Sequence, residues 1–262
     1  LPMPQTFQLK FVLEHLRHYF AKVIERYVIR PESKQIALAL LLGQKESLGK
    51  EVKQAYSATG TQHILAVSGL HVGIIYSILL LPLTYFKQEG HALRKSYLLL
   101  VMGLIWIYAL MTGFSPSVVR AVVMFSLVTL GQMRKRKPSI WNTLSFSALL
   151  LLVLDPGVRT DLGFQLSYLA VAGIVGLQPL ILQLWSPSSR ALDYFWQMAS
   201  ATLAAQLITS PLTIHYFHTF PSYFLLANLL IVPLSYLILC VGVPFLLLAW
   251  IPFLGRVLGA IV

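Results

Sequence analysis

Residues 223–262 decide the fold class, and they read YFLLANLLIVPLSYLILCVGVPFLLLAWIPFLGRVLGAIV. Arg256 is the only charged side chain in this run. A helix rises about 1.5 Å per residue, so about 20 apolar residues cross the roughly 30 Å hydrocarbon core of a bilayer. The run is therefore long enough for two passes, and it predicts membrane-spanning helices.

The composition of the whole chain agrees with this prediction. Hydrophobic residues make up 57% of the 262 residues and charged residues 11%, whereas soluble domains contain about 45–50% and about 25%. Together with a mean hydropathy of +0.73, these values exclude an ordinary globular domain and a disordered chain. Further apolar runs lie at 63–86, 97–113, 117–133, 140–154, 163–185 and 196–216. We predict an all-α polytopic membrane protein with about seven or eight transmembrane helices and with broken or re-entrant segments.

The first 60 residues have a different character. Residues 7–30 alternate apolar and charged side chains at helical spacing, which predicts an amphipathic helix ended by Pro31. This helix either lies at the membrane interface or packs one face on the protein. Residues 36–43 are too short to span and form a buried short helix or a re-entrant piece. We expect residues 1–60 at the outer interface, residues 61–262 as the transmembrane domain, and the chain, which starts at Leu1, to be part of a longer protein.

The net charge of +11 indicates the topology. By the positive-inside rule, the basic loops between the runs face the cytoplasm. These loops contain Lys87, Arg94, Lys95, the run 134–137 and Arg190. Arg159 falls on the opposite, outer side, and the N-terminal segment is expected there as well. Cys240 is the only cysteine and lies in an apolar run, so we expect no disulfide and no thiolate metal site.

Polar residues inside apolar runs are costly and therefore informative. The first group is GTQHILAVSGLHVG, residues 60–73, in which Gly69 and Gly73 form a GxxxG pattern. With Ser68 and the histidines His63 and His71, this pattern predicts a broken helix whose backbone meets a ligand, or a packing face with histidines bonded between helices.

A second group surrounds Arg120 in GFSPSVVR, residues 113–120, where Ser115 and Pro116 start a helix. Arg120 then lies inside the helix, where it either needs a partner or a water-filled cavity or extends to the membrane interface with no further role. Asp161, Gln165 and Tyr168 share one helix face, and Asp161 is the candidate for a structural ion pair with Arg120. The single polar residues Gln206, His215, His218 and Asn228 each favour an interhelical hydrogen bond.

The topology places several of these polar groups at one membrane face. With the basic loops inside, the outer ends of the spans carry His63, Arg120, Asp161, Gln165, His215 and Asn228. Surface facing lipid would not collect them there. We therefore predict a hydrated outer vestibule, with a constriction at the break around Ser68 to Gly73.

Three segments in this order, GTQHILAVSGLHVG, GFSPSVVRAVVMF and DPGVRTDLGFQLSYLAVAGI, resemble the membrane core of ComEC-type competence proteins, from about Ala39 to about Pro233. The resemblance implies a channel that passes single-stranded DNA across the bacterial cytoplasmic membrane in natural transformation. It also implies partners: an OB-fold-like and a metallo-β-lactamase-like domain of the parent chain, a DNA receptor outside and an ATP-driven translocase inside. Neither companion domain has its pattern in this chain, which also lacks a nucleotide-binding P-loop.

On this interpretation the chain is not an enzyme and needs no cofactor or metal. The residues expected along the DNA path or pore are His63, Ser68, Gly69, His71, Gly73, Arg120, Gln165, Tyr168 and Asn228. The oligomeric state stays open. Two other functions also stay open: an intramembrane serine hydrolase, with Ser68 as nucleophile and His215 or His218 as base, and a small-solute transporter.

Overall fold

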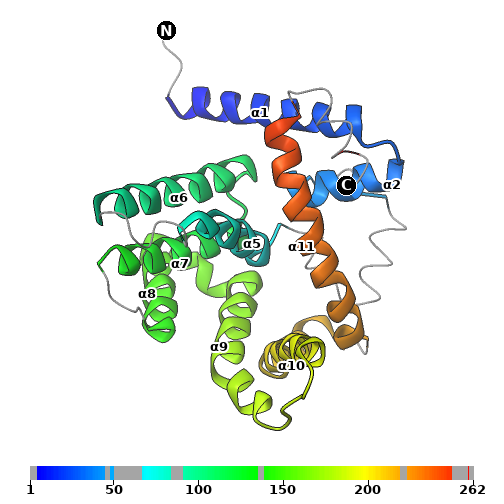
Figure 1. Cartoon of the computed structure of the whole chain (residues 1–262). Coiled ribbons are helices and arrows are strands. Elements are labelled where there is room, and N and C mark those ends of the chain that lie inside the picture. The colour runs from blue at the N-terminus through cyan, green and yellow to red at the C-terminus, as the bar shows by residue number, and fades with distance from the viewer. Residues whose placement is uncertain are drawn as a thin grey trace.

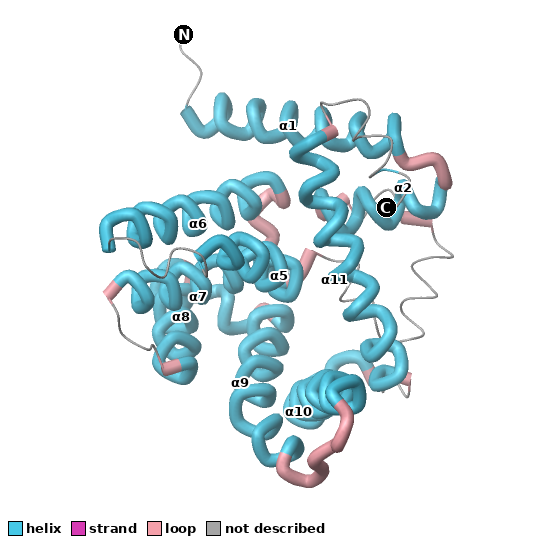
Figure 2. Tube along the Cα trace, viewed as in Figure 1, coloured by secondary structure: helices cyan, strands magenta, loops and turns pink. Residues whose placement is uncertain are grey.

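The computed structural model describes residues 5–44, 48–49, 67–83, 91–134, 139–218, 223–249 and 259. Within these residues the chain forms helices and no strands, as the sequence predicts (Figures 1 and 2). The α-helices are α1 (Gln5–Tyr27), α2 (Pro31–Leu42), α5 (Gly69–Leu80), α6 (His91–Met111), α7 (Pro116–Met133), α8 (Ile140–Leu154), α9 (Leu162–Leu182), α10 (Arg190–Phe217) and α11 (Phe224–Leu248). A 3-10 helix, η3 (Pro156–Thr160), joins α8 to α9.

Four helices in the described ranges are long and apolar enough to cross a membrane. Their apolar windows are Leu93–Met111, Pro116–Met133, Leu162–Leu182 and Phe224–Leu246. Gly69–Leu83 and Ile140–Leu154 are apolar but shorter. α10 has 28 residues, but polar side chains such as Gln197 and Gln206 interrupt its apolar surface. The number of seven or eight spans stays a prediction.

The N-terminal helices pack on the protein rather than standing apart from it. Ala21 and Ile24 of α1 are buried in a cluster with Leu38 and Leu41 of α2 and with residues of α11. α1 ends at Tyr27 rather than near residue 30. The residue before a proline avoids the helical region, and Arg30 is extended with ψ 131°, so Pro31 begins α2 instead of closing α1. α2 starts five residues before the apolar run, and its residues 37–42 are buried in the protein.

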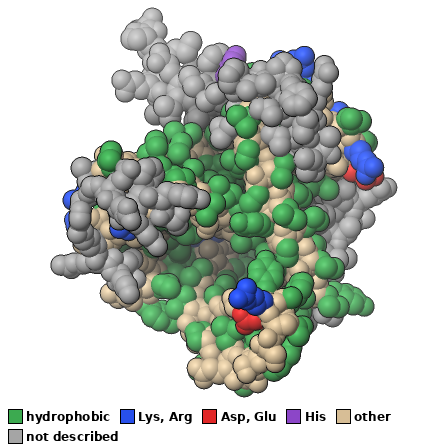
Figure 3. Space-filling view, in the orientation of Figure 1, with side chains coloured by type: hydrophobic (Ala, Val, Ile, Leu, Met, Phe, Trp, Pro, Cys, Tyr) green, Lys and Arg blue, Asp and Glu red, His purple; other side chains and the backbone are tan. Residues whose placement is uncertain are grey.

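α5 is the central helix of the core. Its Ile74 belongs to the cluster formed with α1, α2 and α11. Its Val72 and Tyr76 belong to a second cluster with Ile105 of α6 and Val122 of α7. Figure 1 shows α5 between α7 and α11. The space-filling view shows green hydrophobic side chains over much of the described surface, which fits a membrane protein (Figure 3).

The two glycines of the GxxxG pattern form the contact face of α5 on α7. A Cβ atom on Gly69 would lie 3.4 Å from Cβ of Ala121, and one on Gly73 would lie 3.3 Å from Cζ of Phe125. Ala121 and Phe125 are four residues apart and therefore lie on one face of α7. The helices approach this closely because glycine has no side chain.

α9 and α10 form the most extensive helix pair among the described elements, and they lie side by side in Figure 1. Gly173 of α9 is buried at their contact, where a Cβ atom would come 2.7 Å from the carbonyl oxygen of Ala204. Real Cβ atoms do not approach a backbone oxygen this closely. The pair therefore depends on a glycine at this position.

We expect Gly173→Ala to lower the stability of the protein by about 1–3 kcal/mol, because the added methyl group forces the two backbones apart. The matched control is Gly103→Ala in α6, where the added Cβ meets no atom within 4 Å. Thermal unfolding of both purified variants in detergent provides the measurement. Equal melting temperatures for Gly173→Ala and the unmodified protein would contradict the packing described here.

Candidate functional site

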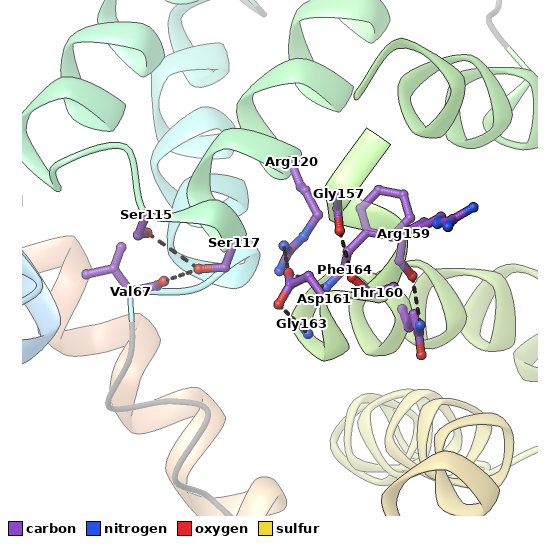
Figure 4. A network of polar contacts seen from close by, with 11 residues as sticks. Val67, Ser115, Ser117, Arg120, Gly157, Arg159, Thr160, Asp161, Gly163 and Phe164 are labelled. Carbon is purple, nitrogen blue, oxygen red and sulfur yellow. Dashed lines mark hydrogen bonds and ion pairs between the residues drawn. The ribbon is translucent and has the colours of Figure 1, made fainter. Parts of the chain in front are cut away.

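Helices α5, α7 and α9 begin next to one another, and their first residues form a three-helix junction (Figure 4). The hydroxyl of Ser117 in α7 donates a hydrogen bond to the carbonyl oxygen of Val67, just before α5, at 2.8 Å. Nη1 of Arg120 in α7 lies 3.5 Å from Oδ2 of Asp161, just before α9. We use the name junction for Val67, Ser117, Arg120, Asp161 and Gly163. It brings together one residue or more from each of the three sequence segments described above.

The turn between α6 and α7 determines where Arg120 lies. The amide of Phe114 donates to the carbonyl of Ala109 at 2.8 Å, and the amide of Gly113 donates to that of Leu110 at 3.0 Å. This pair of bonds is the Schellman end of a helix. Gly113 has φ +70° and Phe114 has φ 51°, so two successive residues take the left-handed conformation and the chain reverses at once. α7 then starts at Pro116, which places Arg120 in its second turn.

Arg120 is a buried cation with little compensation. It is 5% exposed, and its ion pair with Asp161 has a long separation of 3.5 Å. Its Nε atom is buried, and none of the described residues provides a hydrogen-bond partner for it. A guanidinium carries five N–H donors, and a buried charge is costly unless these are satisfied. The site therefore has spare capacity for an acceptor group.

Asp161 has two tasks at the junction. Its carboxylate caps α9, because Oδ2 accepts a hydrogen bond from the amide of Phe164 at 2.9 Å and Oδ1 accepts one from Gly163 at 3.3 Å. The same Oδ2 faces Arg120. The Asp161 side chain is 47% exposed, whereas that of Arg120 is 7% exposed. The pair thus has a buried cationic side and an open anionic side.

Ser68 and His71 close the start of α5. Nδ1 of His71 accepts a hydrogen bond from the backbone amide of Ser68 at 3.2 Å and lies 3.0 Å from the Ser68 hydroxyl. An acceptor nitrogen carries no proton, so the proton of the neutral ring is on Nε2. Among the described residues, the histidine in contact with Ser68 is His71, whereas His215 and His218 are exposed at the end of α10.

Gln165 and Tyr168 bond within the protein. Nε2 of Gln165 donates to the carbonyl of Arg159 at 2.8 Å, and the hydroxyl of Tyr168 donates to Oγ of Ser147 in α8 at 3.1 Å. Both side chains line a shallow groove of about 490 Å³ between α8, α9 and α10. Its other lining residues are Leu144, Ser145, Ala148, Leu169, Ala172 and Leu212. The groove is mostly apolar, and its two largest polar side chains hold neighbouring segments.

The structure does not bring all the candidate residues to the junction. Asn228 lies in the first turns of α11, and its buried Oδ1 has no hydrogen-bond partner within the described part of the chain. His63 lies outside the described residues. Within the described part of the chain, no group of three or more His, Cys, Asp or Glu could hold a metal ion. Ser117, Ser147 and Gly163 are contacts that the sequence interpretation missed, although two serines in the apolar α8, Ser145 and Ser147, were a signal.

Comparison with known proteins adds a family match. The Competence protein family matches residues 40–262. The chain is 31% identical over 230 residues to ComE operon protein 3 of Bacillus subtilis, covering 88% of this chain and 28% of that protein. It is 28% identical over 223 residues to Recombination protein 2 of Haemophilus influenzae, covering 82% of this chain and 28% of that protein.

A further match is Competence protein ComA of Neisseria gonorrhoeae, 28% identical over 142 residues, or 52% of this chain and 20% of that protein. The chain spans under a third of the length of each of these relatives. No solved structure gives a significant match. The likeness therefore concerns one part of these longer proteins. The family match over residues 40–262 contains the junction.

Proposed function

Because the chain belongs to the competence protein family, we propose that it serves DNA uptake as the membrane channel part of a longer protein. In this proposal it conducts single-stranded DNA across the bacterial cytoplasmic membrane during natural transformation. The name of one relative, Competence protein ComA, points to the same process. The four long apolar helices supply the membrane part that such a channel needs.

The observation that carries the proposal is the junction of three helix starts around a buried arginine. A helix N-terminus carries a partial positive charge, and its first amides lack partners inside the helix. Ser117 ties the start of α7 to the residue before α5, and Arg120 ties α7 to the start of α9. A DNA strand carries one negative charge per nucleotide, and such a positive site compensates it.

We assign the path on this basis. Arg120, Gln165 and His63 belong to an outer vestibule, and the segment with Ser68, Gly69, His71 and Gly73 forms a constriction. Gly69 and Gly73 contribute to it by letting α5 pack closely on α7. Tyr168, which lines the groove, offers a ring on which a base stacks, and the buried Phe164, with its ring centroid 4.5 Å away, packs behind it. Asn228 with its unpartnered Oδ1 completes the set. Few cations line the path, because a strand that moves through a channel must not be held too tightly.

The remaining parts of the proposal concern context. Residues 1–60 lie at the outer face and residues 61–262 form the channel domain of the cytoplasmic membrane. The partners are the OB-fold-like and metallo-β-lactamase-like parts of the parent protein, a DNA receptor outside and an ATP-driven translocase inside. The energy for movement comes from these partners or from a gradient, and the chain itself catalyses no reaction.

A transformable host without the parent gene tests the proposed function. Labelled DNA is scored separately at the cell surface and in the cytoplasm. We expect surface binding to stay and internal label to fall to background, with recovery when the gene is returned. Internal label that persists without the gene would refute the proposed channel.

The contact between Ser68 and His71 favours one second candidate, an intramembrane serine hydrolase. We expect a fluorophosphonate probe to leave Ser68 unlabelled, because the His71 nitrogen that would act as base already accepts the Ser68 amide. The measurement is probe incorporation into the purified parent protein, with Ser68→Ala as the control. Stoichiometric labelling that this substitution removes would favour the hydrolase over the channel.

A further inference from the structure

We propose that Arg120 binds a backbone phosphodiester of the translocating strand, and that this phosphodiester replaces Asp161 as its partner. The inference rests on the proposed function and deepens it, because it identifies the chemical group that the junction holds. It also explains how a buried cation takes part in transport without trapping the strand.

The first step concerns Arg120, whose protein partner satisfies it poorly. The side chain is 7% exposed and its ionic contact with Asp161 is 3.5 Å long, while Nε is buried without a partner among the described residues. The non-bridging oxygens of a phosphodiester accept two parallel N–H bonds from one guanidinium, which a single long contact does not provide. A buried N–H group that lacks a partner among the described residues, close to three helix starts, thus points to an anionic ligand.

The second step concerns Asp161, which keeps its place when Arg120 changes partner. Amides of Gly163 and Phe164 hold both carboxylate oxygens from the α9 side. The start of α9 therefore stays capped without Arg120. Because Asp161 also remains beside the cation, it competes with the phosphodiester and speeds its release.

The third step concerns access, which Gly163 provides. A Cβ atom at this position would lie 3.5 Å from Nη2 of Arg120 and 3.3 Å from Oδ2 of Asp161. Figure 4 shows Asp161 and Gly163 beside the guanidinium end of Arg120. Gly163 and Asp161 are both exposed. The missing side chain at Gly163 therefore leaves the ion pair close to the exposed surface, where an added side chain would cover it.

Binding of a fluorescent oligothymidylate to the full-length parent protein, in phosphatidylcholine nanodiscs and at several salt concentrations, tests the exchange. Asp161→Asn retains a capping side chain but removes the competing charge, so we expect several-fold tighter binding. Arg120→Gln should weaken binding and reduce the slope of log K against log salt by about 0.7, the value for one phosphate contact on a single strand. Gly163→Val should weaken binding by obstruction, with both charges in place.

A methylphosphonate strand, which lacks the backbone charge, is the matched ligand control, and Asp161→Asn should not change its affinity. Unchanged or weaker DNA binding by Asp161→Asn would overturn the exchange, as would an equal gain for the uncharged strand. If phosphatidylglycerol in the discs abolishes the gain in DNA affinity, the site binds a lipid phosphate, and the DNA assignment is overturned. These results do not depend on uptake in cells, so the exchange and the channel can fail separately.

Discussion

Arg120→Ala in the full-length parent protein is expected to reduce internalised DNA by at least tenfold, while DNA bound at the cell surface stays unchanged. The substitution removes the buried cation near the three helix starts. In the proposed path this cation compensates the negative charge of the strand. The measurement uses labelled DNA in a transformable host, with surface and cytoplasmic label counted separately. Membrane abundance of the variant is matched to that of the unmodified protein, because loss of a buried arginine also affects packing.

Arg159→Ala is the matched control for this prediction. Arg159 belongs to η3, next to the start of α9, but its side chain is exposed. We expect internalisation close to normal, because a single exposed charge contributes little to a local site. An equal loss in both variants would show that net charge at this face matters rather than the position of Arg120. Normal uptake with Arg120→Ala would remove Arg120 from the path.

The fold class follows from the sequence because long apolar runs leave few alternatives to membrane helices. The helix boundaries are harder to predict from the sequence than the fold class. At the N-terminus the periodic pattern continues past Tyr27, but the extended conformation of Arg30 before Pro31 separates α1 from α2. The hydrophobic pattern of the sequence also does not show which helices pack against each other. The GxxxG face of α5 predicts a close neighbour, but only tertiary packing selects Ala121 and Phe125 of α7.

The candidate site illustrates the same limit at the level of side chains. Sequence spacing placed Asp161, Gln165 and Tyr168 on one helix face, but Asp161 is the cap and α9 begins at Leu162. The three side chains therefore reach different partners: the α9 amides and Arg120, the carbonyl of Arg159, and Ser147 of α8. Periodicity describes residues inside a helix and says little about the residue that precedes it. The prediction that Arg120 contacts Asp161 rested instead on their opposite charges and on the predicted topology.

Replacing both members of the ion pair separates its structural contribution from its role in transport. Asp161→Asn leaves a buried cation without its counter-charge, and we expect a loss of about 1–3 kcal/mol in stability. The loss is smaller than for a fully buried pair, because Asp161 is half-exposed and solvent screens part of the attraction. The double variant Arg120→Gln with Asp161→Asn removes both charges and should recover most of this loss. Thermal unfolding without DNA measures this recovery.

Uptake should respond differently from stability in the same double variant. If Arg120 compensates the charge of the strand, a neutral pair restores the fold but not the cation, and internalised DNA stays at the level of Arg120→Ala. If the pair only joins α7 to α9, uptake should return together with the melting temperature. Recovery of both would assign Arg120 and Asp161 a purely structural role, and the strand would then need another cation at the outer face. If stability recovers and uptake does not, the guanidinium itself contacts the strand.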